Sequence, residues 1–287
     1  MANLLDIRRR IRSVKNTQQI TKAMKMVSAA KLKRAQDRVV AARPYAAKMT
    51  QVLGRLAARI GDALHDPLLD ERGDRRYLLV LITADKGLAG AFNANLIKAA
   101  QTFLRERADK EVQLLAIGRK GRDFFRRRQI EIVGEYVGLT GKGRIEHAEA
   151  LEVARDIMRR FTEDESLDKV FIIYNEFKSV LQQRVVVEQL LPVPRVETGA
   201  QQAVEYIYEQ PPAEIFGRLL PRYIETQVFR ALLESVASEH GARMTAMDSA
   251  TKNAGELIDN LTLTMNRIRQ AAITKEIIEV VSGAAAL

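Results

Sequence analysis

The chain has 287 residues, of which 47% are hydrophobic and 29% are charged, a balance typical of a folded protein rather than a disordered one. It contains no cysteine, which excludes disulfides, thiolate nucleophiles and zinc–thiolate sites and fits a reducing, cytoplasmic compartment. No run of about 18 consecutive apolar residues occurs, and the N-terminus lacks the apolar core of a secretory signal, so we expect no membrane-spanning helix.

The net charge of +10 is unevenly distributed. Residues 1–60 hold 15 Lys and Arg against 2 Asp and Glu, whereas the rest of the chain holds 31 against 34. The whole basic excess therefore lies in the first fifth of the chain, which predicts an acidic partner for that segment.

Residues 1–60 show one uninterrupted helical pattern. Apolar residues recur at alternating steps of three and four from Leu4 to Ile60, which is the pattern of a helix that pairs with another helix. Pro44 removes one backbone hydrogen bond and should bend the helix without ending it, because the pattern continues beyond it. Between Gln18 and Ser28 this stripe turns polar.

A second long helix is predicted at the other end of the chain, over residues 211–287. It begins at Pro211-Pro212, and its apolar stripe runs from Phe229 to Ile278. Small residues in this stripe, such as Ala250, would allow close approach of a partner backbone. The second stripe reaches further and ends in an apolar tail, so we expect this helix to project beyond the first one.

The residues between the two helices alternate between strand and helix patterns, which indicates an α/β domain with a mostly parallel sheet. Strands are predicted at Tyr77–Thr83, Val112–Gly118, Lys169–Phe177 and Arg184–Val193, with helices at Ala91–Ala108 and Ile145–Phe161. The expected architecture is a long antiparallel coiled coil of N- and C-terminal helices with an inserted Rossmann-like α/β domain. Its parts are a helix at 1–60, a linker at 61–76, the α/β domain at 77–210 and a helix at 211–287.

Three segments resemble the gamma subunits of bacterial F-type ATP synthases. The first is the opening stretch from Ile7 to Leu32, and the second is the loop Asp85-Lys-Gly-Leu-Ala-Gly90. The third is the C-terminal stretch Ile273 to Ala286, with Glu276, Glu279 and Gly283-Ala284. The resemblance covers the whole chain and is weakest in the middle.

This resemblance implies a central rotor shaft that couples proton flow through the membrane c ring to ATP synthesis or hydrolysis, and that regulates the ATPase. It implies one copy per complex, with three alpha and three beta subunits, the epsilon subunit and the c ring as partners. The chain itself would have no catalytic residue, no metal and no cofactor. Its place would be the cytoplasmic face of the bacterial cell membrane, as a peripheral component.

The resemblance also implies contact residues. Met24 and Lys25 would pass an acidic loop of a beta subunit, and this agrees with the apolar positions Ile20, Met24 and Val27, which leave the stripe where it turns polar. A harmless stutter in the coiled coil is the alternative. The remaining implied contacts with beta or alpha subunits are Asp85, Lys86, Arg269, Gln270, Thr274, Glu276 and Glu279, and those with the c ring and epsilon are Tyr206, Tyr208 and Glu209.

The loop Asp85–Gly90 could also be a phosphate cradle, because it follows a strand and precedes a helix. It lacks the Gly-Lys-Ser/Thr of a Walker motif, so a glycine-dependent turn is favoured over nucleotide binding. The three histidines match no metal-ligand spacing, and exposed helix positions are expected for them.

Two other functions are alternatives to a rotor shaft. A nucleic-acid-binding coiled coil would explain the basic segment, but residues 1–60 hold one aromatic residue and no docking motif. An α/β enzyme with helical arms lacks a nucleophile–base set or a phosphate loop.

Overall fold

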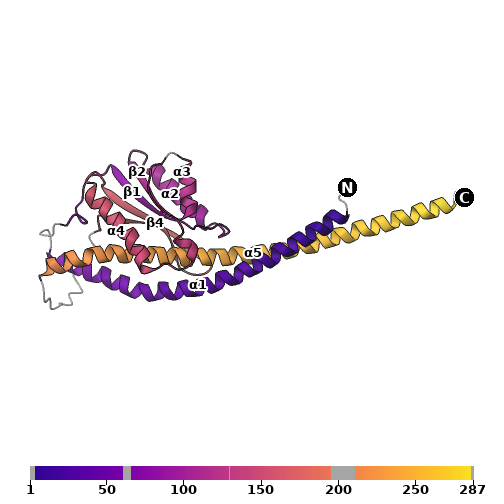
Figure 1. Ribbon diagram of the computed structural model, residues 1–287, viewed down its shortest axis with the longest axis horizontal. Coiled ribbons are helices and arrows are strands. Elements are labelled where there is room, and N and C mark those ends of the chain that lie inside the picture. The colour runs from indigo at the N-terminus through magenta and orange to yellow at the C-terminus, as the bar shows by residue number, and fades with distance from the viewer. Residues whose placement is uncertain (1–3, 61–65, 129, 195–210, 286–287) are drawn as a thin grey trace. The chain divides into compact units, whose positions relative to one another are not determined.

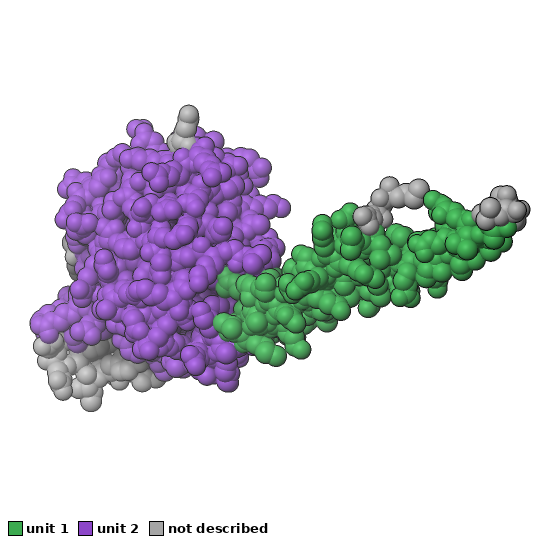
Figure 2. All heavy atoms as spheres, turned by 45° about the vertical axis from the view of Figure 1, so that its right-hand side comes forward, with its two compact units in different colours: residues 1–28, 243–287 green, residues 29–242 purple. Residues whose placement is uncertain are grey.

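The computed structural model describes residues 4–60, 66–128, 130–194 and 211–285. Two long helices begin and end this range: α1 (Leu4–Ile60) and α5 (Pro212–Ala285), of 57 and 74 residues (Figure 1). α1 continues through Pro44 and α5 begins at Pro212, as predicted. The chain forms two compact units, residues 1–28 with 243–287 and residues 29–242 (Figure 2). Each unit contains parts of both long helices, whereas the predicted domains treat each long helix as a separate part. The predicted domain boundaries therefore stay predictions.

In the unit of residues 1–28 and 243–287, the helices are antiparallel. Lys25 Nζ lies 2.6 Å from Asp248 Oδ1, and Thr251 Oγ1 donates to Thr21 Oγ1 at 2.8 Å. Gln18 Nε2 donates to the carbonyl of Thr251 at 3.4 Å. As the residue number falls along α1 it rises along α5, which is the antiparallel order that the two stripes predict.

The polar part of the stripe faces the partner helix in this unit. Thr21 and Ser28 are 8% and 3% exposed, whereas the apolar Ile20 and Val27 are 60% and 56% exposed. Small hydroxyl side chains therefore fill the helix–helix contact, and the large apolar ones turn outward. This confirms the predicted displacement of the apolar positions from the stripe.

The C-terminal part of α5 extends beyond α1 in the same unit. Leu4 lies fourteen residues before Gln18, so the antiparallel register places it opposite Met265. All residues from Arg269 to Ser282 are exposed. The prediction that the C-terminal helix projects beyond the N-terminal one is confirmed within this unit.

The unit of residues 29–242 contains a five-stranded sheet in the order β3-β2-β1-β4-β5. The strands are β1 (Arg76–Ile82), β2 (Glu111–Ile117), β3 (Ile132–Tyr136), β4 (Lys169–Phe177) and β5 (Gln183–Leu191). The first four are parallel, and β5 is antiparallel to β4. The helices that connect the parallel strands are α2 (Phe92–Glu106), α3 (Arg119–Arg126) and α4 (His147–Glu163).

Both faces of the central strands are covered, which explains their continuous apolar sequences. Leu79 and Leu81 pack in one core with α2 and α3, and because side chains alternate along a strand, Leu78 and Val80 face the other side. The predicted fold class is confirmed. The sequence analysis missed β3, a five-residue edge strand that contains Gly134, and α3, which has only two apolar residues.

Buried polar residues of α5 complete the hydrogen bonding of β4. β1 pairs with β4 only as far as Ile173, so the main chain of β4 beyond that point lacks a neighbouring strand on this side. Ser235 Oγ accepts from the amide of Asn175 at 3.3 Å, and Ser238 Oγ donates to its carbonyl at 3.2 Å. The Glu234 carboxylate accepts from the amide of Phe177 at 2.9 Å. These bonds explain why α5 buries serine and glutamate.

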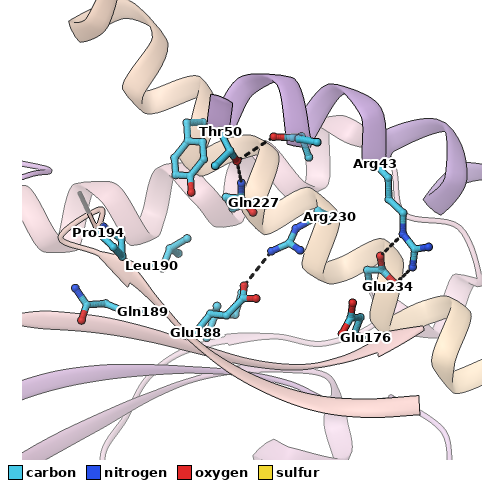
Figure 3. Close-up of a pocket in the computed structure, with 14 residues that line it drawn as sticks. Arg43, Thr50, Glu176, Glu188, Gln189, Leu190, Pro194, Gln227, Arg230 and Glu234 are labelled. Atoms are coloured by element: carbon cyan, nitrogen blue, oxygen red, sulfur yellow. Dashed lines mark hydrogen bonds and ion pairs between the residues drawn. The ribbon is translucent and has the colours of Figure 1, made fainter. Parts of the chain in front are cut away.

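Arg43 adds α1 to this arrangement. Its guanidinium binds both carboxylate oxygens of Glu234, at 2.9 and 3.0 Å, and donates to the carbonyl of Phe177 at 2.7 Å (Figure 3). The bonds to Glu234 raise the pKa of Arg43. Because the Glu234 side chain is only 3% exposed, its charge depends on this bidentate partner.

We expect Arg43→Ala to lower the free energy of unfolding by about 2–3 kcal/mol, because the Glu234 carboxylate stays buried without its cation. Urea denaturation of the full chain measures this. The matched control is Lys48→Ala on the same helix, whose exposed ammonium donates to Gln51, and which should change stability by less than about 0.5 kcal/mol. Equal effects of the two variants would contradict the prediction.

Candidate contact surfaces

The loop after β1 is organised by the carboxylate of Asp85. Oδ1 accepts from the amides of Arg119 and Gly138, each at 3.0 Å, and Oδ2 accepts from the amide of Gly141 at 2.7 Å and the hydroxyl of Thr140 at 3.0 Å. The amide of Asp85 donates back to Thr140 Oγ1. One carboxylate therefore joins the β1 end, the first residue of α3 and the segment that follows β3.

Burial by itself would raise the pKa of the Asp85 carboxyl, but the amides of Gly138 and Gly141, the hydroxyl of Thr140 and the amide of Arg119 lower it below its ordinary value. The ionised side chain accepts from the first amide of α3 and therefore complements the positive end of that helix. The side chain is buried, so the loop shows an internal anchor at Asp85 rather than an exposed charge.

The rest of this loop presents side chains to the outside. Lys86 is exposed, and Leu88 is 64% exposed with a positive φ of 59°, uncommon for a residue other than glycine. The next residue, Ala89, is buried in the core with α2. The buried residues Asp85 and Ala89 fix the loop on either side of Leu88. A large apolar side chain held exposed in this way is typical of a residue that contacts another protein.

In the unit of residues 1–28 and 243–287, the predicted contact residues of α1 differ in environment. Met24 is half-buried, and Lys25 forms an ion pair with Asp248, which also binds Lys252 at 3.2 Å. The hydrogen bonds from Lys25 and Lys252 lower the pKa of Asp248. Lys25 thus has an internal partner, whereas Arg8, Arg9, Arg10, Arg12, Lys15 and Lys22 are exposed and form a basic surface.

The predicted contact residues near the C-terminus are all exposed: Arg269, Gln270, Thr274, Glu276 and Glu279. Two of them are engaged along the helix. Thr274 Oγ1 donates to the carbonyl of Gln270 at 2.9 Å, and Lys275 Nζ lies 3.4 Å from Glu279. Large apolar side chains share this segment and are also exposed: Ile273, Ile277, Ile278, Val280 and Val281.

The structure corrects or leaves open several other expectations. Tyr206, Tyr208, Glu209 and His65 lie outside the described residues. His147 is exposed at the start of α4, as expected, but His240 is buried, so the expectation of an exposed position was wrong for it. His240 lies on the stripe of α5, at steps of three and four from Phe229, so the helical pattern itself was the signal for its burial.

Within the described parts of the chain, no group of His, Asp and Glu side chains has the arrangement of a metal site. The same residues contain no helix with the combined length and hydrophobicity needed to span a bilayer.

Comparisons with known proteins agree with this architecture. The family model described as ATP synthase matches residues 3–287. An ATP synthase gamma chain of Solibacter usitatus is 58% identical over all of this chain and 99% of its own length, and one of Geotalea daltonii is 54% identical over 99% and 98%. The chain belongs to the family of ATP synthase gamma chains.

Solved structures give the same fold. The central stalk and c-ring structure of the Tetrahymena thermophila mitochondrial ATP synthase contains a chain that matches with a TM-score of 0.60 and 26% identity, over 80% of this chain and 99% of that one. A chain of the Euglena gracilis mitochondrial ATP synthase matches with a TM-score of 0.68 and 18% identity, over 99% and 94%. Membership of the gamma-chain family does not support the nucleic-acid-binding alternative.

Sequence reasoning about this gamma chain missed two features of its surfaces. The resemblance implied a subunit contact for Asp85 and gave no sign that its side chain is buried, because its partners Gly138, Thr140 and Gly141 are more than 50 residues away. It also did not single out Leu88, although a leucine between two glycine-containing turns is a usable signal.

We expect Asp85→Asn to lower the free energy of unfolding at pH 7 by about 2–3 kcal/mol, because the new amide group would face two donors, the amide of Gly141 and the hydroxyl of Thr140. The folded-state pKa of Asp85 is lower than the unfolded one, so its stabilisation is complete above pH values near 4 and is lost as the pH falls through the folded pKa. The variant should lack this acid-dependent component.

Denaturant titrations of the full chain between pH 7 and pH 3 measure both effects. Asp123→Asn is the matched control, since the Asp123 carboxylate pairs with Arg122 and is 46% exposed. An unchanged acid dependence in Asp85→Asn would show that Asp85 is not the anchor.

Proposed function

We propose that this gamma subunit is the central rotor shaft of a bacterial ATP synthase. In this proposal it couples proton flow through the membrane c ring to ATP synthesis or hydrolysis at the alpha and beta subunits and regulates the ATPase. The observation that carries the proposal is the extension of α5 from Arg269 to Ser282, which is exposed throughout and has large apolar side chains. An apolar helix without an intramolecular neighbour requires a surrounding partner.

A ring of three alpha and three beta subunits around a single copy of this chain suits such a helix. The two helices present different side chains in different directions, so each beta subunit would meet a different surface as the shaft turns. A change of nucleotide affinity then follows from differential contacts with two states of the beta subunit. The shaft itself would be non-catalytic, because its sequence contains no Walker motif and no nucleophile–base set.

The proposed contacts form three groups. Met24, Lys25 and the basic surface of α1 would face an acidic loop of a beta subunit, with Lys25 shared between that loop and Asp248. Lys86 and Leu88 would form a second contact, with Asp85 fixing the shape of the loop. The exposed polar residues of α5 would form a third, a catch that breaks and re-forms during rotation: Arg269, Gln270, Thr274, Glu276 and Glu279.

The proposal also includes contacts with the c ring and the epsilon subunit. Tyr206, Tyr208 and Glu209 would belong to the foot that meets the c ring and the epsilon subunit. The chain would then be a peripheral protein at the cytoplasmic face of the cell membrane. The boundaries 1–60, 61–76, 77–210 and 211–287 would separate the N-terminal helix, the linker, the α/β domain and the C-terminal helix.

We expect Arg269→Ala with Gln270→Ala to impair ATP turnover and coupling in the assembled complex, while the shaft still folds and incorporates. Charge-assisted hydrogen bonds contribute about 1.5–3 kcal/mol each, enough to favour one orientation and weak enough to be released by rotation. ATP hydrolysis and ATP-driven proton pumping in membrane vesicles measure turnover and coupling separately.

Arg267→Ala is the matched control for this pair. It removes one exposed charge from the same helix, two residues from Arg269 and therefore nearly opposite to it, and it leaves both proposed catch residues in place. Full activity of the double variant in both directions, or an equal loss in Arg267→Ala, would contradict a catch at Arg269 and Gln270.

We expect the isolated chain neither to hydrolyse ATP nor to bind it tightly. The chain has no Walker motif, and the Asp85 carboxylate occupies the N-terminus of α3. Isothermal titration calorimetry with Mg-ATP tests this, with the assembled complex as the positive control. Submicromolar binding with a stoichiometry near one would overturn the non-catalytic assignment.

A further inference from the structure

A second concentration of positive charge lies on α3, apart from the basic surface of α1. Residues 119–128 hold six Lys and Arg against one Asp. Taking these from the 31 Lys and Arg and the 34 Asp and Glu of residues 61–287 leaves 25 against 33. A strongly basic helix therefore stands in a part of the chain that is otherwise acidic, which indicates a local role for its charge.

Four of these cations share the side of α3 that faces away from the core. On a helical wheel they lie within an arc of about 120°, opposite the buried Gly121 and Phe125. All four are exposed, and none has an ion pair or a side-chain hydrogen bond among the described residues. These four residues form the outer face of α3: Arg119, Lys120, Arg126 and Arg127.

The other two cations of this stretch are engaged within the domain. Arg122 binds the Asp123 carboxylate at 2.7 Å, and the guanidinium of Arg128 lies 3.6 Å from the centre of the Phe124 ring. The outer face has no such internal partners, and like charges on one side of a short helix repel each other. A local cost without an internal gain is typical of a functional surface.

An exposed apolar residue adjoins the outer face. A Cβ atom added to Gly87 would lie 3.7 Å from Lys120 Cε, so the loop after β1 touches the start of α3. The next residue of that loop is Leu88, whose side chain is 64% exposed. The outer face therefore continues the contact proposed at Lys86 and Leu88, and the assignment of its partner rests on that part of the proposed function.

Three kinds of anionic partner carry the charge that this surface requires: lipid headgroups, nucleic acid and protein. Asp123 lies in the middle of the arc and is 46% exposed, so a uniformly negative bilayer or phosphate backbone would meet a carboxylate there. Bases would find no stacking platform, because Phe125 is buried and Arg128 covers the ring of Phe124. A protein segment can place separate carboxylates on either side of Asp123 and pack an apolar side chain on Leu88.

We propose that the outer face of α3 binds an acidic protein segment of a neighbouring subunit. The two ends of the face, residues 119–120 and 126–127, are seven positions apart, which is about 10.5 Å along the helix axis. A partner helix that runs alongside matches this spacing with Asp or Glu side chains two turns apart. Because the contact is electrostatic and exposed, it weakens as the salt concentration rises.

Photo-cross-linking in the assembled complex tests this assignment. The chain has no cysteine, so Asp123→Cys provides a single labelling position at the centre of the outer face and leaves its four cations in place. The purified chain is labelled with benzophenone maleimide and then assembled with the other subunits. We expect cross-links, located by mass spectrometry, to a segment of another subunit that is rich in Asp and Glu, with a lower yield at high salt.

Lys120→Gln with Arg127→Gln, added to the labelled chain, should lower the cross-linking yield about three- to tenfold, because each exposed ion pair contributes modestly to affinity. The melting temperature of the purified chain should stay the same, since neither side chain has a partner among the described residues. The matched control is Lys98→Gln with Arg105→Gln, which removes two exposed cations at the same spacing from α2. Its cross-linking yield should equal that of the labelled chain without it.

Cross-links to lipid or nucleic acid alone, cross-links to a protein segment without acidic residues, or no cross-link in an incorporated chain would overturn the proposal. An equal loss of yield in the two double variants would do the same. Incorporation and ATP hydrolysis are measured on the same samples. A chain that does not assemble contradicts the proposed function together with this contact, whereas an active complex without the cross-link contradicts this contact alone.

Discussion

The unit of residues 29–242 depends on one constraint: the main chain of β4 must find hydrogen-bond partners beyond the point where β1 ends. β4 continues beyond its pairing with β1, and its main-chain groups at Asn175 and Phe177 must find other partners. α5 provides them through the buried side chains of Glu234, Ser235 and Ser238. The charge of Glu234 in turn requires Arg43. A shortage of hydrogen bonds at one strand thus determines side chains on both long helices.

The same logic governs the loop after β1. Several N–H groups at the start of α3 and after β3 converge on one point, and Asp85 supplies the acceptor from within the chain. An α/β sheet of this order offers a crevice for anions beyond its carboxyl edge. Here the Asp85 carboxylate is the anion that these N–H groups bind. The loop it fixes holds exposed residues such as Lys86 and Leu88 in one conformation.

Sequence patterns predicted most of the helices and strands, because these elements are determined largely by residues that are close in sequence. The stripes of the two helices, the four apolar strands and the start of α5 at Pro212 follow from period and proline position. β3 did not follow, since this edge strand has only five residues and Gly134 and Glu135 interrupt its apolar pattern. The internal position of Asp85 depends on residues from distant segments. No short-range pattern contains that information.

The extension of α5 beyond α1 has a consequence for its dynamics. From Arg269 to Ser282, the bonds found within the described residues are the helix's own backbone hydrogen bonds and short-range pairs such as Lys275 with Glu279. Isolated helical segments of this length are marginal in water. Amide protons in this segment should therefore exchange with solvent much faster than those near Thr251, where α1 packs alongside. Enclosure by a partner would then slow that exchange, so protection of these amides reports assembly directly.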